Sequence, residues 1–124
     1  MAFARKPGGE GPVAENPEIG ASLDAAGIST NIHIRGQGPP LLLLHGSGPG
    51  VSAWANWRLS IPALEGHFRV LAPDIVGFGY TERPVGITYD LATWRRHLEG
   101  VVDAAGLVEF SIVGNFIGGA LALA

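Results

Sequence analysis

The sequence contains no cysteine among its 124 residues, which excludes disulfide bonds, zinc–thiolate sites and iron–sulfur clusters. The same absence leaves the redox compartment open. Charged residues are also scarce, since they make up 15% of the chain, against about 25% in ordinary globular domains. So few charges are typical of a fold whose elements are covered on several faces.

Basic clusters and long apolar runs are missing as well. The net charge is −3 and the pI is about 5.7, so the chain offers neither a basic stripe for nucleic acid nor a cationic helix face for a lipid surface. Residues 1–18 carry charges, glycines and prolines with no apolar segment behind them, unlike a secretion signal or an anchor. No stretch is long enough to cross a bilayer. We therefore expect no nucleic-acid or membrane partner, a cytoplasmic location, and a flexible N-terminal tail over residues 1–18.

Residues 19–124 alternate between short apolar runs and helical patterns and form one domain. Residues 19–25 and 30–35 predict an antiparallel hairpin at a sheet edge. Residues 41–44 are four consecutive leucines, typical of a strand buried on both faces, as in a parallel sheet. Residues 68–73 and 108–113 predict two further strands.

Two segments have helical patterns. Residues 54–64 predict a short helix in which Pro62 sets a limit or a kink. A second helix of about four turns ends at Gly106, and its apolar face comprises Leu91, Trp94, Leu98, Val101, Val102 and Ala105. Strands that alternate with helices predict an α/β doubly wound sheet with right-handed crossovers.

The last eleven residues follow the strand predicted at residues 108–113 and predict a sharp turn into a helix. A nucleophile elbow, Gly-x-Ser-x-Gly, would occupy this turn, with Gly114 and Gly118 as its flanking glycines. The central residue is Phe116, and its phenyl ring cannot attack a carbonyl carbon. A bulky residue at such a strained turn costs about 1–3 kcal/mol.

Taken together, six motifs resemble those of the meta-cleavage-product hydrolases of the α/β-hydrolase superfamily, and within that group the 2-hydroxymuconate-semialdehyde hydrolases. In chain order these motifs are residues 45–50 (HGSGPG), 54–59 (WANWRL), 72–74 (APD), 77–84 (GFGYTERP), 114–115 (GN) and 118–119 (GG). The resemblance runs from about residue 17 to residue 124. It implies the N-terminal part of an α/β-hydrolase fold, with an antiparallel edge hairpin, a mostly parallel sheet and flanking helices, left incomplete.

The resemblance also implies a function. The family consists of hydrolases without cofactor or metal that cleave a carbon–carbon bond in dienoate ring-fission products of aromatic catabolism, using serine, histidine, aspartate and an oxyanion hole. Carried over, the amides of Ser47, Gly48 and Ile117 fall at the oxyanion hole. Asn56 and Asn115 fall where side-chain amides contact the small-molecule substrate. Phe116 falls on the nucleophilic serine.

Chain order decides the rest of the triad. In α/β-hydrolases the acid and the histidine follow the nucleophile, and none of residues 117–124 is Asp, Glu or His. All four histidines precede Phe116. We therefore expect this chain, read as a truncated segment, to be inactive alone.

Most candidate residues also have a purely structural interpretation. His45 can shape its loop, Asn56 can cap or tether its helix, and Asp74 can cap the loop to Gly79. Packing or turn roles of this kind are also open to Ser47, Ser52, Trp54 and Trp57.

Two other functions stay open. One is a non-catalytic module that holds a carboxylate or enolate on the oxyanion loop. The other is association of the exposed sheet edge beside residues 108–113 with a second copy or with a separately encoded C-terminal half. An unpaired apolar edge favours such pairing. Haloalkane dehalogenases and epoxide hydrolases would place Asp at position 116, but Asn56 and residues 47–50 favour the carbon–carbon group.

Overall fold

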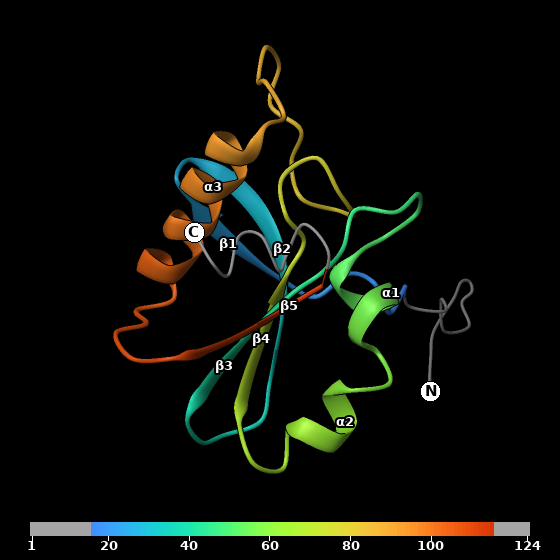
Figure 1. The fold of residues 1–124 in the computed structure, drawn as a ribbon, viewed down its shortest axis with the longest axis vertical. Coiled ribbons are helices and arrows are strands. Elements are labelled where there is room, and N and C mark those ends of the chain that lie inside the picture. Colours follow the sequence, from blue (N-terminus) through green and yellow to red (C-terminus); the bar gives the residue numbers. More distant parts are fainter. Residues whose placement is uncertain (1–15, 116–124) are drawn as a thin grey trace, which may run out of the picture.

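The computed structural model describes residues 16–115 and contains one mixed five-stranded sheet (Figure 1). The spatial order is β1-β2-β4-β3-β5. The first two pairings are antiparallel, and the pairings of β3 with β4 and with β5 are parallel. The strands are β1 (Ala21–Ala25), β2 (Ile28–Arg35), β3 (Pro40–Leu44), β4 (Arg69–Pro73) and β5 (Ser111–Gly114). The predicted α/β class, edge hairpin and parallel core are therefore confirmed.

The hairpin between β1 and β2 is tighter than the sequence suggests. Ala25 pairs with Ile28, so only two residues form the turn, and both have positive φ, 53° at Ala26 and 81° at Gly27. Two consecutive positive φ angles are typical of the type I′ turn, whose twist matches that of the flanking strands. The Asp24 carboxylate accepts a hydrogen bond from the Gly27 N–H at 3.0 Å and closes the turn.

β3 is buried on both faces, as its run of leucines predicts. Leu42 and Leu44 belong to an apolar cluster on the side of helix α3 (Leu91–Ala104). Leu41 and Leu43 belong to a second cluster with residues of α1 (Ala53–Trp57) and α2 (Ile61–Leu64). Because alternate residues of a strand face opposite sides, one strand joins both cores. Helices consequently cover both faces of the sheet (Figure 1).

The prediction of a single helix over residues 54–64 is wrong. The structure has two short helices, α1 and α2, separated by residues 58–60. Pro62 lies in the first turn of α2, where its missing N–H needs no partner. In the interior of one continuous helix, the same proline would remove a hydrogen bond and clash with the preceding turn.

The last strand also differs from its predicted bounds, because β5 begins at Ser111 and not at Val108. Helix α3 ends in a Schellman motif, in which the Leu107 N–H donates to the Val102 carbonyl at 3.0 Å and Gly106 has φ +70°. Val108 follows this motif with its side chain 91% exposed, so it lies outside the sheet. Apolar character alone therefore placed the start of this strand too early.

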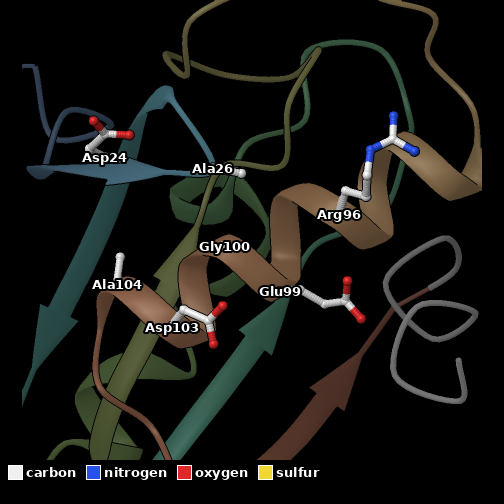
Figure 2. A pocket seen from close by; sticks show the side chains of 7 residues that line it. All are labelled: Asp24, Ala26, Arg96, Glu99, Gly100, Asp103 and Ala104. Atoms are coloured by element: carbon white, nitrogen blue, oxygen red, sulfur yellow. The ribbon is translucent and has the colours of Figure 1, made fainter.

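Gly100 lets α3 approach the hairpin closely. A Cβ at this position would lie 2.6 Å from the Ala26 nitrogen and 2.9 Å from the Ala25 carbonyl carbon. An open groove of about 550 Å³ lies at this contact, and Figure 2 shows Asp24 and Ala26 on one side of it and Arg96, Glu99 and Asp103 on the other. Arg95 and Glu99 form an exposed i,i+4 ion pair on the same helix, as expected of a solvated face.

Residues 16–18, which the sequence assigns to the tail, contact β2 and the loop after β4. Asn16 donates to the Tyr80 hydroxyl at 2.7 Å, and the Glu18 carbonyl accepts from Asn31 Nδ2 at 2.7 Å. The rest of the predicted tail lies outside the described residues. Within residues 16–115, no helix is long and apolar enough to cross a membrane.

His97 fastens α3 to the sheet from inside the core. Its Nδ1 accepts from the Val76 N–H at 3.1 Å, so the proton of the neutral ring is on Nε2, which lies 2.8 Å from Thr30 Oγ1. The Thr30 hydroxyl in turn donates to the Ile28 carbonyl. The imidazole is 2% exposed, and burial lowers the pKa of His97 to about 4.

This lowered pKa predicts a pH-dependent stability. Between pH 6.5, the ordinary value, and about pH 4, the unfolded chain binds a proton on His97 and the folded chain does not. Acidification through this window should therefore lower the free energy of unfolding by up to about 3 kcal/mol, after which the loss levels off. Urea unfolding of the native protein and of His97→Gln at several pH values measures the difference. Identical pH slopes for the two proteins would contradict this prediction.

Candidate active site

The candidate site lies at the carboxyl ends of β3, β4 and β5, with the loops that follow β3 and β4 and with Asn115 after β5. These strands run parallel (Figure 1). His45, Asp74 and Asn115 follow them directly and therefore lie at the same edge of the sheet. In open α/β sheets, ligands bind at this edge.

His45 is a buried, neutral residue that shapes the loop after β3. Its Nε2 accepts from the Ile75 N–H at 2.9 Å, and its Nδ1 lies 2.6 Å from the Gly46 carbonyl oxygen. The ring packs edge-on against Phe78, with the ring centroids 5.2 Å apart. Burial lowers the pKa of His45, against smaller opposing effects of the Gly46 carbonyl and the Asp74 charge. The loop-shaping interpretation of His45 is therefore confirmed.

Asn56 joins the β3 loop to the end of β5. Its Oδ1 accepts two hydrogen bonds, from the Gly46 N–H at 2.9 Å and from Asn115 Nδ2 at 3.2 Å. Asn115 is also held by its backbone, because its N–H donates to the Leu44 carbonyl at 3.0 Å. The tether predicted for Asn56 thus exists, but it runs to neighbouring elements and not along its own helix. A substrate contact by Asn56 or Asn115 stays a prediction.

Asp74 is fully buried and accepts hydrogen bonds from three parts of the chain. Its Oδ1 accepts from the Ala53 N–H at 2.7 Å. Its Oδ2 accepts from Asn31 Nδ2 at 2.9 Å and from the Tyr80 N–H at 2.8 Å. Charge-assisted hydrogen bonds of this kind offset the cost of burying a carboxylate. The predicted cap of the loop to Gly79 is confirmed, and the same side chain also fixes the start of α1.

Helix α1 begins beside the candidate site and is capped by Ser52. The Ser52 hydroxyl oxygen accepts from the Ala55 N–H at 3.0 Å and donates to Glu18 Oε1 at 2.8 Å. A serine at this position satisfies one of the free amides at the helix start. Ser52 therefore has a structural role, as the sequence suggested.

The remaining predicted site residues lie in three places: on an exposed loop, at the end of β5, and outside the described residues. Ser47 and Gly48 lie on an exposed loop and line an open cleft of about 560 Å³ together with residues of the segment 77–83. Gly114 is the last residue of β5, paired with Leu44. Phe116, Ile117 and Gly118 lie outside the described residues. In the part of the chain that the structure describes, no group of three His, Cys, Asp or Glu residues is arranged to hold a metal ion.

Two residues of this region were missed from the sequence. Asn31 is 6% exposed within β2, and its Oδ1 accepts from the Gly20 N–H while its Nδ2 donates to Asp74 and Glu18. Asparagine is uncommon in strands, so its presence in an alternating segment was the available signal. Glu18 gave no comparable signal, because its contacts lie far away in the sequence.

The Asp74 contacts predict a large effect of removing its charge. Asp74→Asn should lower the free energy of unfolding by about 2–3 kcal/mol, because an amide NH₂ would face N–H donors and leave them without an acceptor. Asp103→Asn is the matched control, since Asp103 is exposed on α3, and should change stability by less than about 0.5 kcal/mol. Urea unfolding measures both variants. Equal stability of the two would show that the Asp74 charge is dispensable.

Comparison with known proteins identifies the family. The family model for the alpha/beta hydrolase fold matches residues 39–124. A 2-hydroxy-6-oxo-2,4-heptadienoate hydrolase of Pseudomonas putida F1 is 56% identical over 109 residues, covering 88% of this chain and 40% of that protein. A 2-hydroxymuconate semialdehyde hydrolase of Pseudomonas sp. CF600 is 53% identical, with 88% and 38% covered.

A solved structure agrees with these relatives. It is that of a mutant meta-cleavage product hydrolase from Pseudomonas fluorescens IP01 complexed with acetates, which superimposes with a TM-score of 0.85 at 55% identity. The match covers 87% of this chain and 40% of that one. This chain thus spans about two-fifths of the length of the proteins it matches. It belongs to the α/β-hydrolase fold family and is similar, over most of its own length, to the meta-cleavage product hydrolases.

Proposed function

We propose that this chain carries the anion-binding part of a serine-type hydrolase site that acts on 2-hydroxy-6-oxohexa-2,4-dienoate-type ring-fission products of aromatic degradation. We further propose that the 124-residue chain binds such a compound without cleaving it. The observation that carries the proposal is the Asn56 side chain, which joins the exposed Ser47–Gly48 loop to Asn115 by two hydrogen bonds.

The names of the relatives support the substrate class. The two Pseudomonas proteins are named for hydrolysis of a 2-hydroxy-6-oxo-2,4-heptadienoate and of 2-hydroxymuconate semialdehyde. Both compounds have a carbonyl group that a nucleophile can attack. The Pseudomonas fluorescens enzyme is described as complexed with acetates, which are small carboxylates. A site that binds an enolate or a carboxylate oxygen is consistent with all three.

The chemistry of the described residues supports a site of neutral donors. Preorganised amide groups stabilise a developing oxyanion better than water does, because they need no reorganisation during the reaction. The backbone amides of Ser47 and Gly48 are of this kind. His45 is fully buried beneath this loop, and both of its ring nitrogens are hydrogen-bonded to the backbone. We therefore assign it no role as general base.

The inactivity that we propose follows from residue types. Phe116 occupies the position that the family fills with serine, and no Asp, Glu or His follows it among residues 117–124. In a serine protease, loss of the nucleophile alone costs on the order of a millionfold in turnover. A chain of these 124 residues would need a nucleophile, an acid and a histidine from elsewhere.

The test of inactivity is a spectrophotometric assay. The purified chain should not bleach a yellow 2-hydroxy-6-oxo-dienoate, and Phe116→Ser should not do so either, because the acid and the histidine are still missing. The full-length Pseudomonas putida relative, assayed under the same conditions, is the positive control. Turnover by the unmodified chain would refute the proposed inactivity.

Binding is tested separately with a 2-hydroxypenta-2,4-dienoate as a non-cleavable probe. Trp54 and Trp57 lie on α1 beside Asn56, so their fluorescence should change on titration and reach saturation. Asn56→Leu removes the acceptor that joins the loop to Asn115 and should weaken binding about tenfold. A flat titration of the unmodified protein would refute the binding function.

Self-association is a second candidate function, favoured by one observation. Within residues 16–115, β5 pairs on one side only, with β3, and Val113 is 44% exposed. Such an edge can accept a strand from another chain. Light scattering across a range of concentrations should then show a dimer, and Val113→Lys should shift it towards monomer. A monomer at every concentration would contradict self-association.

A further inference from the structure

We propose that His45 is a positioning residue that directs the Ser47 N–H out of the protein, towards a bound carboxylate or enolate oxygen. The ligand in this statement rests on the proposed function. The direction of the N–H group does not, because it follows from hydrogen bonds between described residues alone.

The first step concerns the tautomer of His45. The Ile75 backbone N–H can only donate, so the Nε2 atom that lies 2.9 Å from it must be an acceptor. A neutral imidazole then carries its proton on Nδ1. This N–H donates to the Gly46 carbonyl oxygen at 2.6 Å. The Ile75 N–H, on the loop after β4, thus determines that Nδ1 is the His45 nitrogen that donates to the loop after β3.

The second step uses the planarity of the peptide group. The Gly46 carbonyl and the Ser47 N–H belong to one trans peptide, so they point in opposite directions. The carbonyl points inward, to an imidazole that has no exposed surface. The Ser47 N–H therefore points outward, where Ser47 is exposed and lines the 560 Å³ cleft. None of residues 16–115 accepts a hydrogen bond from it.

The third step concerns the preceding peptide, between His45 and Gly46, which is also fixed by a hydrogen bond. The Gly46 N–H donates to Asn56 Oδ1 at 2.9 Å, so both polar groups of Gly46 are fixed by side chains, one from each side. A flip of the Gly46–Ser47 peptide would break the His45 hydrogen bond and leave a buried ring N–H without an acceptor. That cost keeps the Ser47 N–H in place before any ligand arrives.

Two substitutions of His45 distinguish the effects of its two hydrogen bonds, one to Ile75 and one to Gly46. His45→Asn places an amide near the position of Nδ1 and can still donate to the Gly46 carbonyl, whereas His45→Gln places its amide near Nε2 and can still accept from Ile75. Each variant loses one hydrogen bond. We expect only His45→Gln to change the residual dipolar coupling of the Ser47 N–H and to weaken binding of 2-hydroxypenta-2,4-dienoate about tenfold. His67→Gln is the control, because His67 is exposed and distant in sequence.

The outcomes are distinguishable. An unchanged Ser47 N–H coupling in His45→Gln, or equal changes in both variants, would overturn the positioning role. A changed coupling in His45→Gln alone, without binding by any form of the protein, would support the positioning role and refute the proposed function. If neither variant folds, ¹⁵N spectra of the unmodified His45 ring decide, because a proton on Nε2 would overturn the proposal and a proton on Nδ1 supports it.

Discussion

Three consecutive backbone amides after β4 hold the structure together at the candidate site. The Asp74 N–H donates to the Asn31 carbonyl on β2. The Ile75 N–H donates to His45, directly after β3, and the Val76 N–H donates to His97 on α3. All three residues of this segment are buried, so each amide must find a protein partner or lose its hydrogen bond with water. One short segment thereby fixes the position of three separate elements.

The Asp74 carboxylate adds a fourth connection from the same place. It accepts from the first amide of α1, so the loop between β3 and α1 is held at both ends, at His45 and at Ala53. Residues 46–52 between these two points are glycine-rich and largely exposed, and their shape depends on polar contacts more than on apolar packing. A loop held in this way can present backbone amides to a ligand without collapsing onto the core.

The sequence predicted the elements that follow simple patterns. The leucines of β3 and the spacing of α3 gave strand and helix correctly, because burial on two faces and on one face leaves distinct periodicities. It failed where Pro62 divides a helix, and where the apolar residue Val108 lies exposed before β5 and not within it. The pairing of Asn56 with Asn115 was also beyond prediction, because a hydrogen bond between residues 59 positions apart leaves no mark on local sequence.

His45 and His97, two of the three buried histidines, show that the same residue type can have different structural roles. His45 and His97 are both neutral and both accept a backbone N–H, but with opposite ring nitrogens, Nε2 in His45 and Nδ1 in His97. The remaining ring proton consequently points to the Gly46 carbonyl in one case and to Thr30 in the other. Only the first of these contacts touches the loop at the carboxyl ends of the strands. His45 therefore fixes the conformation of the loop after β3. Acid–base chemistry at this site would have to come from another residue.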